Sequence, residues 1–490
     1  MNLSRLERAW AWTATPLARA CWDICMRGTK KMLGATLTTA LVLVALATPA
    51  PAAADAETAV TGEAVAGQAV VLYRGAEHER VVELDPALST RQGLRELRAD
   101  PQVRWADPNA IARASVIPRD PGTGGGRGGW QADQWNFLKP PPVGTACSGS
   151  LPCGVNAPRA WKLLRRAGHP EGRRPDGKRG PIVAVIDTGV AYRNMGKRFR
   201  RSPDLAAGVF FRGRDFIDGD RVPLDKNGHG THVASTIFEQ TGNRVGVTGL
   251  ADGLRLMPVR VLGVGGSGSA SDVAKGIRWA ARNGAQVINL SLEFSAGFSG
   301  CNGLRAVCEA IRSARRGGAL VVAAAGNAGT SGALMPAKVA FGVASATIRG
   351  CLSEFSSRGP GVDITAPGGG TDAPGAGSQC REFAPSPPIV QLTLPFNAPL
   401  RGNFRRFGYP RYEGTSMSTP HVSGAAGLVL ASGVLKRKLD DKPNPKQLAE
   451  WLRCTARPVS DPAKAQLYGA GLLDLAAAVD RASRCPALTG

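Results

Sequence analysis

Four apolar runs without polar alternation constrain the fold of this chain more than any other feature. The runs lie at 182–186, 256–262, 286–292 and 319–325. Strands have this composition when helices cover both faces of a parallel sheet. Helical stretches lie between the runs, at 232–239, 271–283 and 304–316. The alternation of strand and helix predicts an α/β fold of three layers, with a mostly parallel central sheet and helices on both faces.

The chain divides into four segments by composition and pattern. They are 1–54, 55–115, 116–155 and 156–490. In that order we expect an N-terminal extension with a secretion signal, a small α+β unit, a linker with an N-terminal arm, and the α/β body. Within the α+β unit, the pattern predicts strands at 69–74 and 103–106 and a helix over 89–99.

Two segments rich in Gly or Pro interrupt the regular pattern. Residues 122–129 are rich in glycine, but no strand precedes them and no Gly-Lys-Ser/Thr ending follows. We therefore interpret them as a flexible linker rather than a phosphate-binding loop. Residues 369–412 are rich in both Pro and Gly, and we interpret them as a loop insertion in the body. Within this insertion, 389–394 is a candidate hairpin.

Residues 26–54 have the three parts of a secretion signal. Basic residues at 27, 30 and 31 precede an apolar stretch at 32–48, and small residues follow at 50–54. A membrane anchor is the alternative, but the apolar stretch is shorter than the roughly 20 residues that a span needs. We therefore expect secretion, to the periplasm or the medium, without a stable membrane anchor. Met26 is a candidate initiator for this signal.

Eight of the ten cysteines follow the signal, since Cys21 and Cys25 precede it. An even number after a secretion signal indicates disulfides formed in an oxidising compartment. Eight cysteines can pair in many ways. Proximity in the sequence favours two pairs that each close a short loop, and the remaining four cysteines then form two pairs of longer separation. The favoured pairs are Cys147–Cys153, Cys301–Cys308, Cys351–Cys380 and Cys454–Cys485. A zinc site is the alternative, but these positions contain no C-x-x-C pair.

The net charge of +23 is unevenly distributed. Residues 55–115 carry a net charge of −3 and residues 116–490 one of +22, and we expect these opposite charges to favour attraction between the two parts. The basic residues are scattered, and no RNP, zinc-finger or helix-turn-helix pattern accompanies them. We therefore expect no specific nucleic-acid partner.

The segment 414–421 reads Gly-Thr-Ser-Met-Ser-Thr-Pro-His and opens a helix-like run. Its serine, Ser416, lies beside the unpaired backbone N–H groups of a helix N-terminus, which can stabilise an oxyanion. A serine has no reactivity without a base, however. The remaining question is whether the chain supplies a histidine, an orienting carboxylate and a second oxyanion donor.

Three further polar residues follow strand-like runs or glycines. Asp187 ends the first apolar run, where functional side chains collect in α/β sheets, although a turn cap is the alternative. His229 lies between two glycines ahead of a helix. One alternative is that His229 and His232 bind a metal together, but the sequence offers no further ligands for such a site. We expect His232 to be a packed, hydrogen-bonded residue. Asn327 directly follows the last apolar run, where a simple turn is the alternative.

The joint order of these residues is more specific than any one of them, because Asp-His-Ser is one of the three chain orders known for a catalytic triad. Three blocks carry a family resemblance: Ile-Asp-Thr-Gly at 186–189, His-Gly-Thr-His-Val-Ala at 229–234 and Gly-Thr-Ser-Met at 414–417. The chain resembles the subtilisin-like (S8) secreted serine proteases, the subtilases. The resemblance covers nearly all of the chain after the signal.

This resemblance implies a serine endopeptidase that acts on proteins and peptides through an acyl-enzyme. Ser416 would be the nucleophile, His229 the base, Asp187 its orienting carboxylate and Asn327 the second oxyanion donor. Residues 55–115 resemble the family's inhibitory prosegment, which is removed by self-cleavage. We expect a monomeric zymogen whose prosegment is an intramolecular inhibitor.

The resemblance also implies a peptide-binding cleft. The family's substrate-binding edge strand corresponds to Gly266, Ser267 and Gly268, and the pocket walls correspond to Ser291, Leu292, Glu293, Ala324 and Gly326. Three positions depart from the family pattern. Glu293 replaces a usual Gly and is expected to narrow the pocket rim or favour a basic substrate side chain. Ser235 replaces a Gly in the helix after His229, and Leu334 is expected to fill part of the pocket floor.

The chemistry needs no cofactor, but the resemblance implies structural calcium. Oxygen-rich loops contain Asp204, Asp215, Asp218, Asp220 and Asp225, and ordinary caps and ion pairs are the alternative use of these carboxylates.

Overall fold

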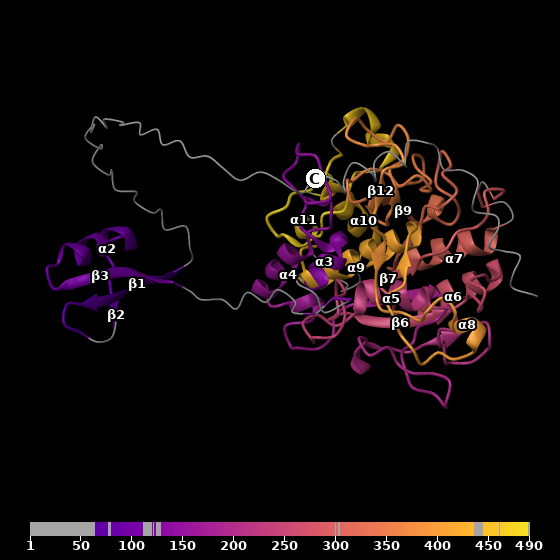
Figure 1. Ribbon diagram of the computed structural model, residues 1–490, viewed down its shortest axis with the longest axis horizontal. Coiled ribbons are helices and arrows are strands. Elements are labelled where there is room, and N and C mark those ends of the chain that lie inside the picture. Colours follow the sequence, from indigo (N-terminus) through magenta and orange to yellow (C-terminus); the bar gives the residue numbers. More distant parts are fainter. Residues whose placement is uncertain are drawn as a thin grey trace, which may run out of the picture. The chain divides into compact units, whose positions relative to one another are not determined.

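The structure is a computed structural model that describes residues 64–76, 80–110, 120, 122, 123, 129–298, 300, 301, 304–435, 444–459 and 461–488. The expected secretion signal, with Cys21 and Cys25, lies outside these residues. The chain forms two compact units, Met1–Ala112 and Arg113–Gly490 (Figure 1). Within the described segments, none of the helices combines the length and apolar character that crossing a membrane requires.

The first unit is a three-stranded antiparallel sheet with one helix. Strand β1 (Ala64–Tyr73) lies between β2 (Arg80–Glu83) and β3 (Val103–Ala110). Helix α2 (Thr90–Ala99) begins with a capping box, in which Ser89 and Gln92 each bond the other's backbone N–H. The apolar side chains of the helix and sheet form a separate small core. The expected helix and strands are confirmed.

The second unit is built on a sheet of seven strands, all parallel, in the order β10-β9-β8-β7-β4-β6-β5. The strands are β4 (Ile182–Asp187), β5 (Arg214–Asp215), β6 (Arg255–Arg260), β7 (Val287–Leu290), β8 (Leu320–Ala324), β9 (Phe341–Ala346) and β10 (Ile364–Pro367). The chain places β6 on one side of β4 and β7 on the other. A crevice therefore opens at the carboxyl end of β4, where α/β sheets bind ligands.

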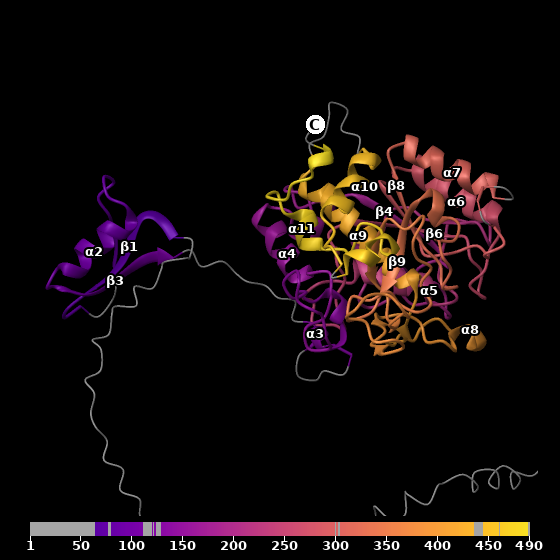
Figure 2. The ribbon, with the colours of Figure 1, turned by 90° about the horizontal axis from the view of Figure 1, so that it is seen from above.

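Helices cover both faces of this sheet, as predicted (Figures 1 and 2). Along β4, Ile182, Ala184 and Ile186 belong to one apolar core, and Val183 and Val185 belong to the other. The first core contains α6 (Ala270–Arg282) and α7 (Arg305–Arg316), which pack together. The second contains α4 (Ala157–Arg166), α5 (His229–Phe238), α9 (Thr415–Ser432), α10 (Pro445–Cys454) and α11 (Leu475–Val479).

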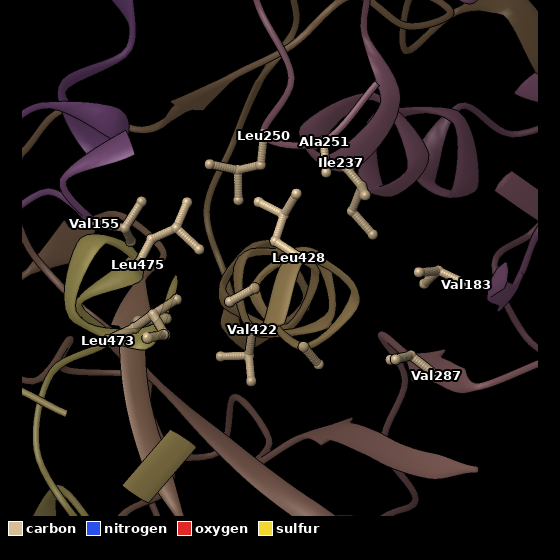
Figure 3. Packing of buried hydrophobic residues seen from close by; sticks show 14 of the residues in the cluster. Val155, Val183, Ile237, Leu250, Ala251, Val287, Val422, Leu428, Leu473 and Leu475 are labelled. Atoms are coloured by element: carbon tan, nitrogen blue, oxygen red, sulfur yellow. The ribbon is translucent and has the colours of Figure 1, made fainter. Parts of the chain in front are cut away.

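Helix α9 lies at the centre of the second core. Sixteen of its 18 residues are buried, so the helix has no polar face that is turned to solvent. Figure 3 shows Leu428 pointing toward Leu250 and Ile237, with Val183 and Val287 of the sheet on another side of the helix. This surrounding layer fixes α9, and with it the position of the helix N-terminus.

Residues 129–155, which we assigned to the linker and arm, form part of the core. Helix α3 (Trp130–Asp133) contributes Trp130, whose ring lies edge-on to Trp161 at 5.7 Å between centroids. Phe137 is fully buried and lies edge-on to Trp161 at 6.4 Å. These aromatic residues follow no helical or strand period, so the sequence pattern did not reveal that they are buried.

The loop insertion at 369–412 contains two short antiparallel ladders. Strand β11 (Gly370–Thr371) pairs with β12 (Pro385–Ser386), and β13 (Ile389–Val390) pairs with β14 (Arg411–Tyr412). The candidate hairpin within 389–394 is therefore wrong. Its first residues pair with a strand far downstream, and the intervening chain contains α8 (Ala398–Arg401). Local pattern cannot specify such a distant partner.

Four disulfides join the eight cysteines in the predicted pairs. They are Cys147–Cys153, Cys301–Cys308, Cys351–Cys380 and Cys454–Cys485. Glu450 lies near the last pair, but both of that pair's sulfurs are bonded to each other, so this cluster is no zinc site.

We predict that the Cys454→Ser/Cys485→Ser variant loses more stability than the Cys301→Ser/Cys308→Ser variant. The first pair closes a separation of 31 residues and the second one of 7. Restricting the unfolded chain in this way is worth about 4 and about 2 kcal/mol, respectively. Urea unfolding followed by circular dichroism measures both losses. Equal losses, or a larger loss for the short loop, would contradict this ranking.

Candidate active site

Asp187 and His229 are joined at the carboxyl end of the sheet. Asp187 is the last residue of β4 and is fully buried, and His229 is the first residue of α5. The Nδ1 atom of His229 lies 2.8 Å from Oδ1 of Asp187, and the imidazole remains 25% exposed. The bond to the carboxylate orients the ring and leaves Nε2 as the nitrogen available for chemistry.

The pKa of His229 is raised above its ordinary value. Burial lowers this pKa, but the negative charge of Asp187 and its hydrogen bond together raise it by more. The buried Asp225 adds a smaller contribution in the same direction. The site therefore stabilises the imidazolium form of His229 more than water does.

Asp225 organises the turn that leads into His229. Its Oδ1 accepts hydrogen bonds from the Thr188 hydroxyl and from two backbone N–H groups of the turn, and its Oδ2 accepts from the N–H and hydroxyl of Thr231. Behind the turn, a Cβ at Gly230 would lie 2.2 Å from the carbonyl oxygen of Gly189, so only glycine fits there. Sequence reasoning missed this role of Asp225, although an aspartate just ahead of Gly-His was a usable signal.

Ser416 is the second residue of α9 and is half-buried. Its hydroxyl donates to the carbonyl oxygen of Ser291 at 3.2 Å, and the Ser291 hydroxyl donates in return to the carbonyl oxygen of Ser416 at 2.8 Å. These two bonds join the start of α9 to the segment that follows β7. Among the described residues, Ser416 and His229 make no direct hydrogen bond, but both line the same cavities.

The side-chain amide of Asn327 is held by Thr415. Its Oδ1 accepts from the backbone N–H of Thr415 at 2.8 Å and from the Thr415 hydroxyl at 3.0 Å. This leaves the Nδ2 amino group as the donor for a group bound next to Ser416. The backbone N–H of Asn327 donates to Oε2 of Glu293 at 2.7 Å.

A cavity of about 350 Å³ adjoins these residues. It is lined by Asn227, His229, Leu262, Gly266, Ser267, Gly268, Val273, Ser291, Leu292, Glu293, Phe294, Asn327 and Ser416. Six of the eight expected substrate-binding residues are present. The other two, Ala324 and Gly326, are buried and do not line it.

Leu334 explains why Gly326 is covered. A Cβ at Gly326 would lie 2.7 Å from the Leu334 side chain, so Leu334 packs directly against this glycine. Leu334 itself is not among the lining residues, and the expectation that it fills the pocket floor is wrong. Glu293 does line the cavity, where burial raises its pKa and the hydrogen bond from Asn327 acts in the opposite direction.

A second cavity of about 490 Å³ meets the first at Ser416. It is lined by Asn227, His229, Asn327, Phe396, Pro399, Arg411, Tyr412, Glu413, Ser416 and Met417. Four of these residues line both cavities. The insertion at 369–412, interpreted from sequence only as a loop, therefore forms one wall of the site.

Two residues of α5, His232 and Ser235, have structural roles. His232 is buried and stacks on Tyr412 at 4.5 Å between ring centroids, with Nε2 at 3.2 Å from the carbonyl oxygen of Ile389. This confirms that it is a packed residue. The hydroxyl of Ser235 donates to the carbonyl oxygen of Leu392 at 2.9 Å, so it ties α5 to the insertion.

Four of the five aspartates considered for calcium are occupied by other partners. Asp225 accepts the bonds described above, and Asp220 accepts from the N–H of Val222. Asp215 and Asp218 both pair with Arg260, at 2.8 and 2.7 Å. These four carboxylates serve as caps and ion-pair partners.

The fifth, Asp204, differs from the others. Its Oδ2 and the Oε2 of Glu239 are buried without a hydrogen-bond partner among the described residues. Burial raises the pKa of Asp204 to about 8, and the charge of Asp120 acts in the same direction. Burial also raises the pKa of Glu239, and the charge of Asp204 adds to that rise. The two oxygens fit a hard cation, which takes carboxylate ligands.

Comparisons with known proteins agree with this geometry. The Subtilase family model matches residues 178–471. Thermitase from Thermoactinomyces vulgaris is 35% identical over 284 residues, which cover 58% of this chain and 82% of that protein. Subtilisin Savinase from Lederbergia lenta is 35% identical over 332 residues, which cover 67% and 98%. A thermophilic serine proteinase from Bacillus sp. (strain AK1) is 33% identical over 345 residues, which cover 69% of this chain and 66% of that protein.

Among solved structures, a protease from Pseudoalteromonas arctica aligns with a TM-score of 0.54 and 28% identity, over 74% of this chain and 99% of that one. The fold and these matches define a class of α/β serine endopeptidases. The chain belongs to the subtilase family.

We predict that Asp187→Asn lowers the pKa of His229 below its ordinary value of about 6.5. The substitution removes the charge that raises this pKa and leaves the burial that lowers it. NMR titration of the imidazole Cε1–H signals in a Ser416→Ala background measures the change, and the chain has only 5 histidines to assign. Asp176→Asn, at an exposed position, is the control that leaves this pKa unchanged. An unchanged or higher pKa in Asp187→Asn would contradict the prediction.

Proposed function

We propose that this subtilase is a secreted endopeptidase, made as a self-processing zymogen, that hydrolyses proteins through an Asp187-His229-Ser416 triad and an acyl-enzyme. One observation carries the proposal. The Asp187–His229 hydrogen bond lies at the edge of two cavities that also contain Ser416 and the Asn327 amide.

In this mechanism, the Oγ of Ser416 attacks the peptide carbonyl while Nε2 of His229 takes its proton. Asp187 holds the His229 tautomer and stabilises the imidazolium, without being protonated itself. The Ser416 hydroxyl must first turn from the Ser291 carbonyl oxygen toward His229, and catalytic hydrogen bonds commonly form only with substrate bound. His229 then protonates the leaving amine, and water resolves the acyl-enzyme.

The tetrahedral intermediate places negative charge on the former carbonyl oxygen. The Nδ2 of Asn327 and the backbone N–H of Ser416 donate to it. Thr415 holds the Asn327 oxygen, so the amino group is oriented before the substrate arrives. In subtilisin, removal of the corresponding asparagine donor costs about 10²–10³ in kcat.

The substrate is a peptide segment in extended conformation. Gly266 and Gly268 let its backbone approach and pair as an added strand. Ser291, Leu292 and Glu293 form the wall beside the residue that precedes the scissile bond. Glu293 brings a carboxylate into this cavity, which favours a basic side chain at that position.

Residues 55–115 act as the inhibitory prosegment in this proposal. The described part of this segment has its own sheet, helix and apolar core, as a folding aid and inhibitor requires. The mature enzyme is a monomer, active in the periplasm or the medium.

Ser416→Ala is expected to abolish both peptide hydrolysis and removal of residues 55–115, because self-cleavage needs the same nucleophile. Intact mass spectrometry of protein made in a protease-deficient host measures the processing. The matched control is Ser418→Ala, two residues along α9, whose buried hydroxyl has no hydrogen-bond partner among the described residues. This control should mature and hydrolyse peptides. Normal maturation of Ser416→Ala would rule out self-processing.

We also propose a structural calcium ion at Asp204 and Glu239. Each of these two buried carboxylates keeps one oxygen without a hydrogen-bond partner among the described residues. The negative charge of Asp204 repels that of Glu239, and a bound cation removes this repulsion. The ion has no part in peptide hydrolysis.

Removal of calcium is therefore expected to lower the thermal stability of the wild type. Binding contributes about 2.7 kcal/mol when free calcium is 100-fold above Kd. In calcium buffer, Glu239→Gln should melt below the wild type and respond little to EDTA. Differential scanning calorimetry with and without EDTA measures both effects. If no cation binds, EDTA leaves Tm unchanged and Glu239→Gln raises it, because the substitution then removes only repulsion.

A further inference from the structure

A cationic lobe lies on the loops 192–203 and 389–412. Together these segments contain nine basic residues and no acidic residue. They are Arg193, Lys197, Arg198, Arg200, Arg201, Arg401, Arg405, Arg406 and Arg411. All except Arg201 are exposed, and none forms an ion pair with a described acidic residue. By contrast, Arg260, Arg349 and Arg453 elsewhere are paired with aspartates.

The two loops are held together as one rigid surface. The rings of Phe199 and Phe404 stack at 5.0 Å between centroids. The backbone N–H of Phe404 donates to the carbonyl oxygen of Arg198 at 2.9 Å, and Nε of Arg198 donates to the carbonyl oxygen of Gly402 at 2.9 Å. Leu394, Ala398 and Phe404 form a small apolar core beneath them. The backbone that carries these charges is therefore fixed before any partner arrives.

The lobe adjoins the catalytic residues. Phe396, Pro399 and Arg411 line the second cavity together with His229 and Ser416. The first cavity is lined by residues 266–268 and also contains Ser416. In the proposed function it holds the acyl half of the substrate, on the other side of Ser416 from the lobe. A peptide that extends across Ser416 therefore continues, with its leaving half, toward the lobe.

The surface combines positive charge with exposed apolar side chains. Leu400 is 90% exposed and Phe396 is 67% exposed, and the ring of Phe396 lies 4.9 Å from that of Tyr412. Guanidinium groups bind carboxylates in bidentate geometry, and the apolar side chains suit a peptide better than a purely phosphate-bearing polymer. Glu413 also lines the cavity and is only three residues from Ser416, so it disfavours an acidic residue directly after the scissile bond.

We propose that the cationic lobe is a docking surface for acidic residues of the substrate, at the second and later positions after the scissile bond. This inference rests on the proposed endopeptidase function, because it places the leaving half of a peptide. It makes the enzyme selective for protein segments in which an acidic stretch follows the cleavage site.

The test uses internally quenched peptides and the mature enzyme. All peptides share one acyl half, taken from a sequence that the enzyme itself cleaves in a casein digest. They differ only at the second to fourth leaving positions, Glu-Asp-Glu against Gln-Asn-Gln. We expect kcat/KM to be roughly 10-fold higher for the acidic peptide at low ionic strength, and this advantage to shrink as NaCl screens the charges.

The decisive variant is Arg401→Gln/Arg405→Gln/Arg406→Gln, in which the ratio of the two kcat/KM values should fall toward 1. The matched control is Arg305→Gln/Arg312→Gln/Arg316→Gln. It removes the same number of positive charges from α7, which lines neither cavity. The control should retain the wild-type ratio of the two kcat/KM values. Hydrolysis of the neutral peptide reports the integrity of each variant.

Three results would overturn the inference. The first is an equal kcat/KM for both peptides in the wild type, and the second is a preference that survives in the lobe variant. The third is a lobe variant that no longer binds single-stranded DNA but retains the wild-type ratio of the two kcat/KM values. That result would show that the lobe binds nucleic acid instead. If the wild type hydrolyses neither peptide nor casein, the proposed function itself fails, and the inference fails with it.

Discussion

The burial of α9 is the constraint on which the site depends. Sixteen of the 18 residues of this helix are buried, and it lies inside the body, between the central sheet and the layer that contains α5 and α4. Its N-terminus then reaches the carboxyl end of the sheet, where it bonds Ser291 after β7 and Asn327 after β8. Ser416 is therefore positioned by the packing of the rest of the helix, because α9 cannot shift without disturbing the close-packed core around it.

Packing does not determine the orientation of the individual side chains in the site, and polar contacts set these orientations. Asp225 holds the turn before His229, Thr415 holds the Asn327 amide, and Ser291 holds the start of α9. The contacts of Thr415 with Asn327 and of Ser291 with Ser416 join segments that are distant in the sequence. A buried network of this kind is stable only when its members find partners, which accounts for the many hydrogen bonds on Asp225.

The sequence predicted the sheet, its helices and the four disulfides, because apolar periodicity and cysteine spacing are local signals. It also predicted Asp187, His229, Asn327 and Ser416 as one group. The structure brings His229, Asn327 and Ser416 to the same two cavities, and the buried Asp187 is bonded to His229. It failed where the partner lies far along the chain. Residues 389 and 390 pair with 411 and 412, and no local pattern specifies that register. The buried tryptophans of the N-terminal arm were missed for a related reason, since they follow no period.

The wall of the first cavity is bonded to the catalytic groups themselves. Ser291 exchanges two hydrogen bonds with Ser416, and Glu293 accepts the backbone N–H of Asn327. A substitution that reshapes this wall to admit a new side chain therefore also disturbs the nucleophile and the oxyanion donor. In directed evolution, selectivity for the residue before the scissile bond and turnover would change together. Residues 396–406 offer the safer place to alter substrate choice.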